Sequence, residues 1–369
     1  MTMNSRMYLD VHVLQTLPPS CVNRDDTGSP KTAVYGGVTR ARVSSQSWKK
    51  AVRELFKETV KEELLGKRTK KIVALVAEEI RQLEITEDVE KAAQKALEVA
   101  GLDIKSVENG TDALFFMSYA QAKALARLIA DNEEVLTGAP SKELKAKAKE
   151  AIKQYPGLDI ALFGRMVAND HSLNTDACAQ VAHSISTHKA VTEYDYFTAV
   201  DDLAPEDNAG AGHIGTVEFN SSTLYRYATV AVHELKKHLD DETPMAVGSF
   251  VEAFVRSMPT GKQNTFANRT MPDAVLVTLR SDQPINMVGA FERPVQAGVN
   301  NEKGYVEPSA KALETHAQSV YQDWLGEPEV SLVAGSYLGE LGEKLPFKEL
   351  LKKLQQEIEV RVGNGGDGQ

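Results

Sequence analysis

Cysteine is scarce in this chain of 369 residues: only Cys21 and Cys178 occur, and no Cys-x-x-Cys pair is present. Two isolated cysteines support neither a disulfide framework nor a thiolate zinc site. The sequence also lacks an apolar run long enough to span a bilayer, and its first residues, MTMNSRMYLDVHV, lack the pattern of a signal peptide. We therefore expect a cytoplasmic protein that has no membrane partner.

Motifs of the common catalytic sites are missing as well. No His-Glu-x-x-His motif occurs, and Gly261-Lys262 has neither the earlier glycine nor the following serine or threonine of a P-loop. His183 and His188 fall in residues 176–190, which we predict to be helical, and a spacing of five does not suit a shared helix face. We therefore expect no catalytic residue, no metal and no cofactor.

The overall charge is acidic, with 52 Asp and Glu against 42 Lys and Arg and a formal net charge of −10. Such a balance argues against indiscriminate nucleic-acid binding, but it permits one basic groove on an otherwise acidic surface. The composition is otherwise that of a globular protein, with 42% hydrophobic and 25% charged residues, and the length suits two or three structural units.

One basic stretch differs from this acidic background, Tyr35 to Lys57 (YGGVTRARVSSQSWKKAVRELFK). A strand is predicted over residues 38–43, on which Arg40 and Arg42 point to the same side. Apolar residues then recur at helical spacing, which predicts an amphipathic helix that begins at a serine and runs to about Gly66. The candidate caps are Ser44, Ser45 and Ser47, and the apolar residues are Trp48, Ala51, Val52, Leu55 and Phe56.

From Arg24 to Lys57, eight basic residues stand against three acidic ones, a local excess of five positive charges. The first N–H groups of the helix, the serine hydroxyls and the Gln46 amide add neutral hydrogen-bonding groups beside the cations, which suits phosphate. Cations opposite an apolar stripe are usually only a solvated face, yet cations in a first turn oppose the helix dipole. The basic residues are Arg24, Lys31, Arg40, Arg42, Lys49, Lys50, Arg53 and Lys57; the acidic ones are Asp25, Asp26 and Glu54.

The rest of the chain predicts an α+β fold. We expect a turn role for Asp25 and Asp26, and a hydrogen-bond partner for His12 in the first strand. The order of elements is that of a split βαβ sheet decorated by insertions, an RRM-like (ferredoxin-like) arrangement. The aromatic signature of ordinary RRMs is missing, so RNA would not be read by stacking on an open sheet face. Expected strands are residues 7–14, 158–166, 274–279 and 287–291, with a hairpin from 193–203 to 213–232; expected helices are four within 67–154, then 176–190, 228–239, 244–255, 309–324 and 347–360.

Several segments together resemble one family, the CasC backbone subunit of the type I-E Cascade, a CRISPR RNA-guided surveillance complex. The resemblance covers residues 7 to about 300, and its motifs are specific only when taken jointly. It implies an RRM-like palm (1–57, 166–191 and 227–369), a helical fingers insertion (58–165) and a β-hairpin thumb (192–226). The matching segments are VHVLQTLPPSCVNRDD, YGGVTRARVSSQSWKKAVR, DIALFGRM, DYFTAVDDL, HIGTVEFNSSTLYRY and KQNTFA.

The resemblance also implies a function and a set of residues. Copies would stack head to tail along CRISPR RNA, grip its backbone, and present its bases for pairing with target DNA, together with other Cascade subunits in antiviral defence. Backbone contacts would come from Arg24, Lys31, Arg42, Ser44, Gln46, Lys49, Lys50, Arg53 and Lys262. An apolar wedge that displaces a nucleotide would come from Met166, Phe197 and Ile214, with Tyr196 where the family is expected to have tryptophan.

Two other functions stay open at this point. Related backbone subunits in other CRISPR effectors cut RNA with an aspartate of the thumb, so a metal-dependent RNA endonuclease that uses Asp201 or Asp202 is the alternative. These carboxylates have no neighbouring His or Lys motif, and a turn role accounts for them. A metabolic α/β enzyme is the third possibility, and it lacks any nucleotide-binding or nucleophile motif.

Overall fold

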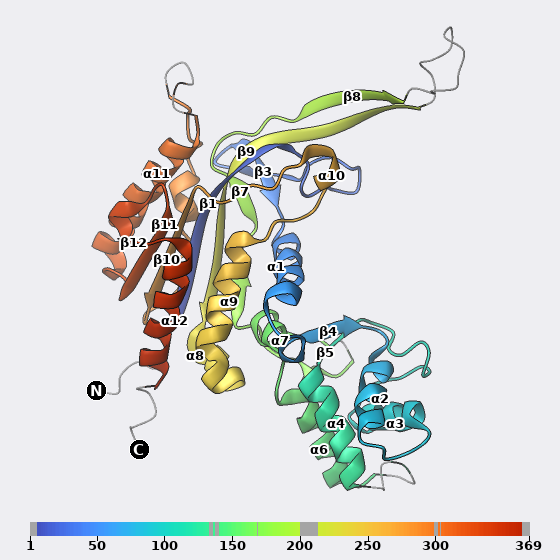
Figure 1. Ribbon diagram of the computed structural model, residues 1–369. Helices are drawn as coiled ribbons and strands as arrows, with labels where there is room; N and C mark the ends of the chain where they lie inside the picture. The colour runs from blue at the N-terminus through green and yellow to red at the C-terminus, as the bar shows by residue number, and fades with distance from the viewer. Residues whose placement is uncertain are drawn as a thin grey trace. The chain divides into compact units, whose positions relative to one another are not determined.

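The computed structural model describes residues 6–132, 136, 140–167, 169–199, 213–298, 302 and 304–363. The chain is a mixed α+β protein with one large sheet, a two-stranded sheet and several helices (Figure 1). It divides into two compact units. The first comprises Met1–Val52, Val181–Thr229 and Phe250–Arg361; the second comprises Arg53–Gln180, Val230–Ser249 and Val362–Gln369.

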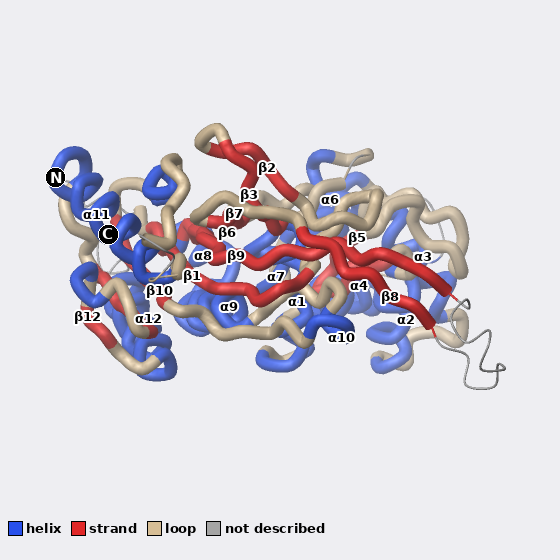
Figure 2. Tube along the Cα trace, turned by 90° about the horizontal axis from the view of Figure 1, so that it is seen from above, coloured by secondary structure: helices blue, strands red, loops and turns tan. Residues whose placement is uncertain are grey.

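The large sheet has the strand order β12-β11-β10-β1-β9-β7-β3-β2, and β6 and β8 also pair with β9 (Figures 1 and 2). Strand β1 is antiparallel to β10, in register from Tyr8↔Arg280 to Leu14↔Ala274, and both of its faces are buried over residues 9–14. The strands are β1 (Tyr8–Ser20), β2 (Thr32–Tyr35), β3 (Val38–Val43), β6 (Ala179–Val181), β7 (Ser184–Ser186), β8 (Glu193–Ala199), β9 (His213–Ala231), β10 (Ala274–Arg280), β11 (Val330–Gly335) and β12 (Glu343–Lys344).

One face of this sheet is covered by α11 and η5, through a hydrophobic core that includes Leu14, Leu276, Phe291 and Leu313. Burial of these apolar side chains is the main favourable term for the unit. The helical elements that lie wholly or partly in the first unit are α1 (Ser45–Thr59), α9 (Thr243–Arg256), α10 (Gln263–Phe266), η5 (Met287–Phe291), α11 (Val306–Val320), the π-helix η7 (Tyr321–Leu325), η8 (Gly339–Leu341) and α12 (Phe347–Gly363).

A buried arginine joins the other face of the sheet to two helices. The Arg226 guanidinium, on β9, donates to Gln15 Oε1 on β1 and to the carbonyl oxygen of Phe254 on α9. Its Cζ atom lies 3.7 Å from the ring centroid of Trp48 on α1 and 4.7 Å from that of Phe254. Burial lowers the pKa of Arg226 to about 9. Because no carboxylate in the described part of the chain is bonded to it, this cation is stabilised there by ring faces and neutral oxygens.

A buried histidine lies on the opposite face of β1. The Tyr225 hydroxyl accepts the N–H of Met287 at 3.0 Å and is hydrogen-bonded to His12 Nδ1 at 2.8 Å. Burial lowers the pKa of His12 to about 3. Nearby, Asp10 Oδ1 accepts the Tyr227 hydroxyl at 2.7 Å, and burial raises the pKa of Asp10 to about 6. The prediction that His12 is a hydrogen-bonded strand residue is confirmed.

The second unit packs helices beside the β4–β5 ribbon, around a core that includes Ile72, Leu97, Met117 and Leu125. Its helices begin at side-chain caps where the sequence supplies them, since Ser118 and Gln121 form a capping box. The elements are η1 (Glu62–Leu64), β4 (Gly66–Thr69), α2 (Ile72–Gln82), α3 (Val89–Val99), β5 (Phe115–Ser118), α4 (Tyr119–Asp131), α6 (Lys142–Lys153), α7 (Leu158–Phe163), η2 (His171–Leu173), α8 (Val232–Leu239) and η4 (Asp240–Glu242).

Many local predictions are confirmed. The strand over residues 38–43 is β3, the helix predicted from Ser141 to Gln154 is α6 with Ser141 as its cap, and the hairpin is β8–β9. These elements share a local signal, because a cap residue, strict alternation or a glycine-rich turn marks them without help from the rest of the chain.

Other predictions are wrong, each where a distant partner decides the structure. Residues 67–154 are not helical throughout, because β4 and β5 pair with each other. Residues 176–190 form β6 and β7 rather than a helix, and every side chain of β7 is buried. Residues 158–163 are the helix α7 rather than a strand, and it ends at Gly164 with φ +76°. The segment 287–291 is the helical turn η5, β1 extends to Ser20, and β11 and β12 were not predicted.

We predict that Arg226→Ala lowers the free energy of unfolding by about 3–5 kcal/mol, because it leaves two buried oxygens without a donor and empties the space beside two rings. Urea-induced unfolding measures the change. Lys348→Ala, at an exposed position, is the control, and its expected change is about 0.5 kcal/mol or less. A loss for Arg226→Ala no larger than that of the control contradicts the stated role.

We predict a pH dependence that passes through His12. The unfolded chain takes up a proton at this residue below pH 6.5, whereas the folded chain stays neutral to about pH 3, so stability is lost as pH falls through that window. Asp10 acts in the opposite direction between about pH 6 and pH 3.8. Urea unfolding of wild type and of His12→Gln at several pH values isolates the contribution of His12. The difference between the two unfolding free energies should change by at most about 1.4 kcal/mol per pH unit. If the unfolding free energies of wild type and His12→Gln differ by the same amount at every pH, the assignment is wrong.

Candidate nucleic-acid interface

A closed loop after β1 displays the first two predicted cations. Asn23 O accepts the N–H of Lys31 at 2.9 Å, which joins the two ends of the loop. Inside it, Asp25 Oδ1 accepts the N–H of Ser29 at 3.0 Å, which confirms the predicted turn role. Arg24 is exposed at the loop surface and Lys31 is half-buried at its base.

Helix α1 begins where the sequence predicts. Ser44 Oγ accepts the N–H of Ser47 at 3.3 Å, so Ser44 is the cap. The N–H of Ser45 is donated to His183 Nδ1 at 3.0 Å. Of the three first-turn N–H groups, only that of Gln46 has no partner among the described residues. The expectation that several free N–H groups open this end to phosphate is therefore wrong, because protein side chains satisfy two of them.

His183 lies near two of the predicted cations, Arg42 and Lys31. Burial lowers the pKa of His183, and the charges of Arg42 and Lys31 lower it further. Arg42 Nε donates to Thr32 O at 3.1 Å, which holds its guanidinium beside β2. A small hollow adjoins this group, and its polar lining residues are Ser20, Asn23, Lys31, Arg42, Asn220 and Ser222. The sequence did not indicate His183, Asn220 or Ser222, because their positions depend on how β7 and β9 pair.

Lys262 reaches the same end of β1 from a loop far along the chain. A Cβ atom on Gly261 would lie 2.3 Å from Val22 O, so only glycine allows this close approach. Lys262 itself has φ +49°, in the left-handed region. The pKa of Cys21 is raised by burial and lowered by Arg24 and Lys262, whose charges are therefore both near that thiol. The structure thus brings Lys262 together with Arg24.

The predicted cations of α1 differ in their surroundings. Lys50 is exposed, and burial lowers the pKa of the half-buried Lys49. Arg53 belongs to the second unit, where its Nε lies 3.3 Å from Asp159 Oδ2 and its Cζ lies 4.4 Å from the ring centroid of Phe116. Burial raises the pKa of Asp159, and the charge of Arg53 opposes that shift. Arg53 therefore has a structural partner as well as its predicted role.

Arg40 is not available to a ligand. Its guanidinium is buried and donates to Tyr35 O at 3.1 Å, Ser186 O at 3.0 Å and Phe291 O at 2.8 Å. Although Arg40 and Arg42 are two residues apart on β3, only Arg42 is partly open to solvent. The local excess of positive charge on the surface is correspondingly smaller than the sequence indicates.

The hairpin β8–β9 carries exposed aromatic side chains, and its two arms run side by side in Figure 2. Tyr196 pairs with Thr216, whereas Phe197 pairs with Gly215, so the two aromatic residues point to opposite faces. Tyr196 is 63% exposed and Phe197 41%; a Cβ on Gly215 would lie 2.4 Å from the Phe197 ring. The side chain of Ile214 lies outside the described part of the chain, as do Asp201, Asp202 and the whole segment 200–212.

Met166 belongs to the second unit and is 83% exposed. The preceding Arg165 is buried and donates to the carbonyl oxygens of Leu173, Phe116 and Ile152, each at 3.0 Å. Burial lowers the pKa of Arg165 to about 10. The buried arginine fixes the backbone of this segment, so that the next side chain projects into solvent.

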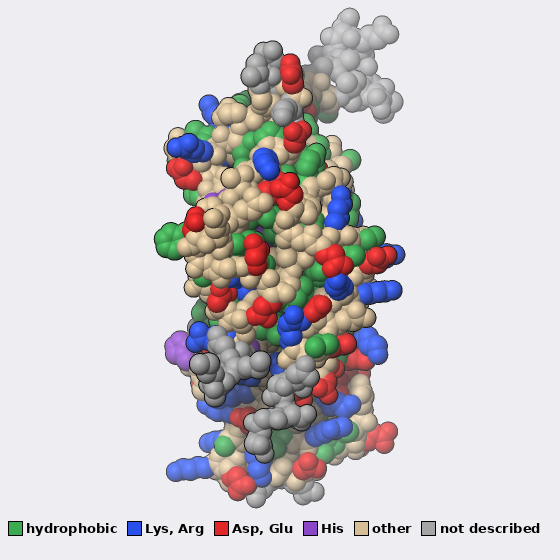
Figure 3. Space-filling view, turned by 90° about the vertical axis from the view of Figure 1, so that its left-hand side faces the viewer, with side chains coloured by type: hydrophobic (Ala, Val, Ile, Leu, Met, Phe, Trp, Pro, Cys, Tyr) green, Lys and Arg blue, Asp and Glu red, His purple; other side chains and the backbone are tan. Residues whose placement is uncertain are grey.

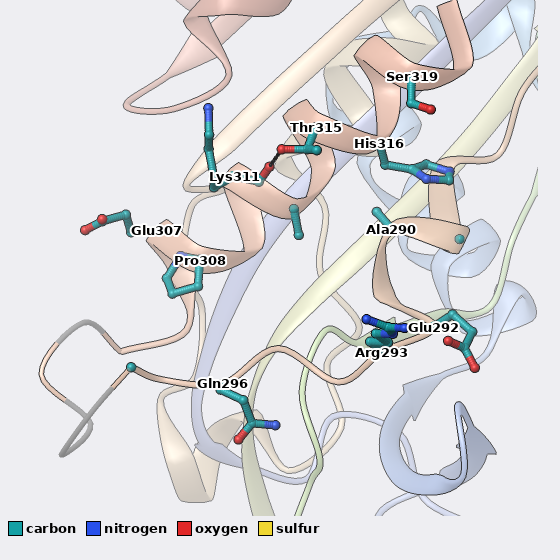
Figure 4. Close-up of a pocket in the computed structure, with 13 residues that line it drawn as sticks. Ala290, Glu292, Arg293, Gln296, Glu307, Pro308, Lys311, Thr315, His316 and Ser319 are labelled. Atoms are coloured by element: carbon teal, nitrogen blue, oxygen red, sulfur yellow. Dashed lines mark hydrogen bonds between the residues drawn. The ribbon is translucent and has the colours of Figure 1, made fainter. Parts of the chain in front are cut away.

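Other surfaces offer less to a nucleic acid. A hollow of about 890 Å³ lies between η5 and α11, and Figure 4 shows acidic and basic side chains around it, including Glu292, Arg293, Glu307 and Lys311. None of the residues predicted from the sequence lines it. Figure 3 shows a face on which acidic and basic side chains are interspersed. Among the described residues, no group of three or more potential metal ligands occurs, and no helix is long and apolar enough to cross a membrane.

Six of the cations predicted from the sequence have no carboxylate partner among the described residues, whereas the predicted Arg53 is paired with Asp159. Within the described ranges, no carboxylate oxygen lies within 4.0 Å of the basic groups of Arg24, Lys31, Arg42, Lys49, Lys50 or Lys262. Three of these side chains come from the loop after β1 and the end of β3, two from α1, and one from the loop before α10. All belong to the first unit. This arrangement can bind a polyanion through charge without any catalytic group.

Comparisons with known proteins show which solved structures this chain resembles. A solved structure described as a CRISPR RNA-guided surveillance complex, pre-nicking, contains a chain 30% identical to this one, with a TM-score of 0.78 over 95% of this chain and 99% of the other. A chain of a second structure, described as a CRISPR RNA-guided surveillance complex, is 28% identical, with a TM-score of 0.62 and the same coverage. No curated protein sequence matches.

A protein-family model settles the relationship. The model described as CT1975-like protein matches residues 9–356, which is nearly the whole chain. The match includes both compact units and every element that carries the unpaired cations. The chain is a member of the CT1975-like protein family.

Proposed function

We propose that this protein is an RNA-binding backbone subunit of a CRISPR surveillance complex, of the CasC type found in type I-E Cascade. The observation that carries the proposal is that six of the predicted cations, all in the first unit, have no carboxylate partner among the described residues. Relatives of known structure are chains of CRISPR RNA-guided surveillance complexes, which supplies guide RNA as the polyanion.

The chemistry of the surface suits a sugar–phosphate backbone of any sequence. Lysines, arginines and neutral hydroxyl or amide groups bind phosphate and ribose, and they leave base edges free to pair with target DNA. Ser44 Oγ accepts the N–H of Ser47 as the helix cap, and a hydroxyl in that role can still donate its own proton to a phosphate oxygen. Affinity should then depend on salt far more than on guide sequence.

The order of elements in the first unit supports an RRM-like palm. Strand β1, helix α1, strands β7 and β9, helix α9 and strand β10 follow one another as a βαββαβ series, interrupted by insertions. In the sheet these four strands lie in the order β10-β1-β9-β7, which places the first strand between the third and the last. This is the arrangement of a split βαβ sheet.

Exposed apolar side chains supply a wedge. Met166, Tyr196 and Phe197 project into solvent, and Ile214 follows on the other arm of the hairpin. Such side chains offset the cost of unstacking a nucleotide without selecting a base. Head-to-tail stacking of copies along the RNA, together with other Cascade subunits, would repeat this contact at a regular interval.

We further propose that the subunit is not catalytic. The alternative is an RNA endonuclease that uses Asp201 or Asp202. Incubating the assembled protein with guide RNA, complementary RNA and Mg²⁺ separates the two: we expect no cleavage. RNA products that disappear in Asp201→Ala would overturn the proposal.

We predict that Lys31→Ala with Lys262→Ala weakens binding to all guide sequences alike. For single-stranded RNA, each lost phosphate contact lowers the slope of log affinity against log salt by about 0.7, so the pair should lower it by about 1.4. Titration of labelled RNAs of two unrelated sequences over a range of salt concentrations measures this.

The control is Lys348→Ala with Lys352→Ala, which removes the same charge from exposed positions on α12. It should keep the wild-type slope. A loss confined to one guide sequence, or an equal loss in the control, counts against backbone binding. Mass measurement of the purified protein, before and after ribonuclease treatment, tests whether RNA is bound at all.

A further inference from the structure

A second group of unpaired cations lies on the second unit, outside the residues assigned above. The sequence Lys67-Arg68-Thr69-Lys70-Lys71 spans β4 and the turn into α2 (Figure 1). Arg68, Lys70 and Lys71 are exposed, and within the described ranges no carboxylate oxygen lies within 4.0 Å of their basic groups. Lys67 differs from them, because its Nζ lies 3.2 Å from Glu62 Oε1.

Some other exposed cations of this unit have a carboxylate partner, whereas Lys61, Lys123, Arg127, Lys142, Lys145 and Lys153 are exposed with no carboxylate oxygen of the described residues within 4.0 Å of their basic groups. Arg81 pairs with Glu78 and Glu90, Lys91 with Asp88, Lys105 with Asp112, and Lys147 with Glu143. Asp112 lies in the loop that contacts Lys70, and it is already engaged by Lys105. Arg68, Lys70 and Lys71 differ from the other unpaired cations of this unit because all three stand within four consecutive residues.

The backbone that carries these cations is held firmly. Strand β4 pairs with β5 from Gly66↔Ser118 to Thr69↔Phe115. Beyond the strand, Lys70 O accepts the N–H of Thr111 at 3.1 Å, and the N–H of Lys71 is donated to Thr69 Oγ1 at 3.0 Å. The turn is thus ordered before any ligand binds, which lowers the entropy cost of binding to it.

Charge accumulates on one side of the ribbon. Arg68 stands opposite Phe116 in the register, and the guanidinium of Arg53 covers the ring of Phe116. Directly opposed residues of an antiparallel pair share a face, so Arg53 and Arg68 flank the same ring. Asp159 offsets the charge of Arg53 alone, which leaves an excess of three positive charges from Arg68, Lys70 and Lys71.

Within the described ranges, no acidic side chain neutralises these three cations. Lys71 immediately precedes α2, and no acidic residue lies in the first turn of that helix. Mutual repulsion of the three cations therefore persists in the folded protein and is reduced only by salt or by an anionic partner. A linear polyanion can neutralise all three at once, because the cations follow one another within four consecutive residues, from the end of β4 to the turn before α2.

We propose that Arg68, Lys70 and Lys71 bind the phosphate backbone of a nucleic-acid strand, as a second contact surface separate from that of the first unit. The proposal rests on the proposed function, in which guide RNA and target DNA are the polyanions that the protein meets. Phosphate chemistry is common to both strands, so the test contains an arm for each.

The test compares three proteins in full-length form. The variant Arg68→Ala/Lys70→Ala/Lys71→Ala removes the three unpaired cations, and Arg81→Ala/Lys91→Ala/Lys105→Ala removes three that are paired. Each is titrated with labelled polyuridine RNA, polythymidine DNA and a DNA duplex over a range of salt concentrations. The first variant should lower the salt slope for a single strand by about 2, and its affinity at about 0.1 M salt by tenfold or more. The second should keep the wild-type slope.

A smaller variant guards against misfolding. Lys70→Gln/Lys71→Gln leaves β4 unchanged and should lower the slope by about 1.4. An unchanged thermal midpoint in all variants shows that folding is preserved. Loss in the RNA arm assigns the surface to the guide, and loss in a DNA arm assigns it to the target; either supports the proposal.

Two outcomes would overturn this inference alone, and a third would overturn the proposed function as well. If the variant binds all three nucleic acids with the wild-type slope while Lys31→Ala/Lys262→Ala does not, this inference is overturned and the proposed function stands. If the variant alters the mass of the protein assembly but not nucleic-acid binding, the surface contacts protein and the inference is also overturned. If wild type binds no nucleic acid at all, both proposals fall.

Discussion

The first unit depends on a charge buried without a counter-charge. The Arg226 guanidinium lies against the rings of Trp48 and Phe254 and bonds to oxygens of β1 and α9. Taking a cation out of water costs several kcal/mol, and here ring faces and neutral oxygens offset that cost. The same device recurs in Arg40 and Arg165, whose guanidinium groups bond to backbone carbonyls. Each ties together segments that are distant in sequence.

Buried and exposed cations therefore have different roles in this protein. Arg40, Arg165 and Arg226 hold the fold, while Arg24, Lys31 and Lys262 remain at the surface without carboxylate partners. An acidic chain with a formal net charge of −10 still presents localised positive surfaces, because its acidic residues are placed elsewhere. Localised charge of this kind favours a polyanion at one place and limits binding at others.

The proposed function requires binding of RNA at a regular spacing and no making or breaking of covalent bonds. Cations and amides hold phosphate, exposed apolar side chains of the hairpin and of Met166 interrupt the stack, and neither group requires a tuned pKa or a metal. The strongly shifted groups of the first unit, Asp10, His12 and Arg226, lie instead inside the core. Their shifts reflect burial and bear on stability.

The sequence alone determined the features whose cause is local. Alternation predicted β3, serine caps predicted the starts of α1 and α6, and a glycine-rich connection predicted the hairpin. Family motifs pointed to Arg24, Lys31, Arg42, Lys49, Lys50 and Lys262, and their contacts to RNA stay a prediction. Only the tertiary structure decided that Arg40 is buried, that β6 and β7 replace a predicted helix, and that His183 occupies the first N–H of α1. The burial of Arg40, the pairing of β7 with β3 and the contact of His183 with α1 each depend on a partner more than a hundred residues away along the chain, whereas β6 pairs with the nearer strand β9. Local periodicity does not show which distant strand completes a pair.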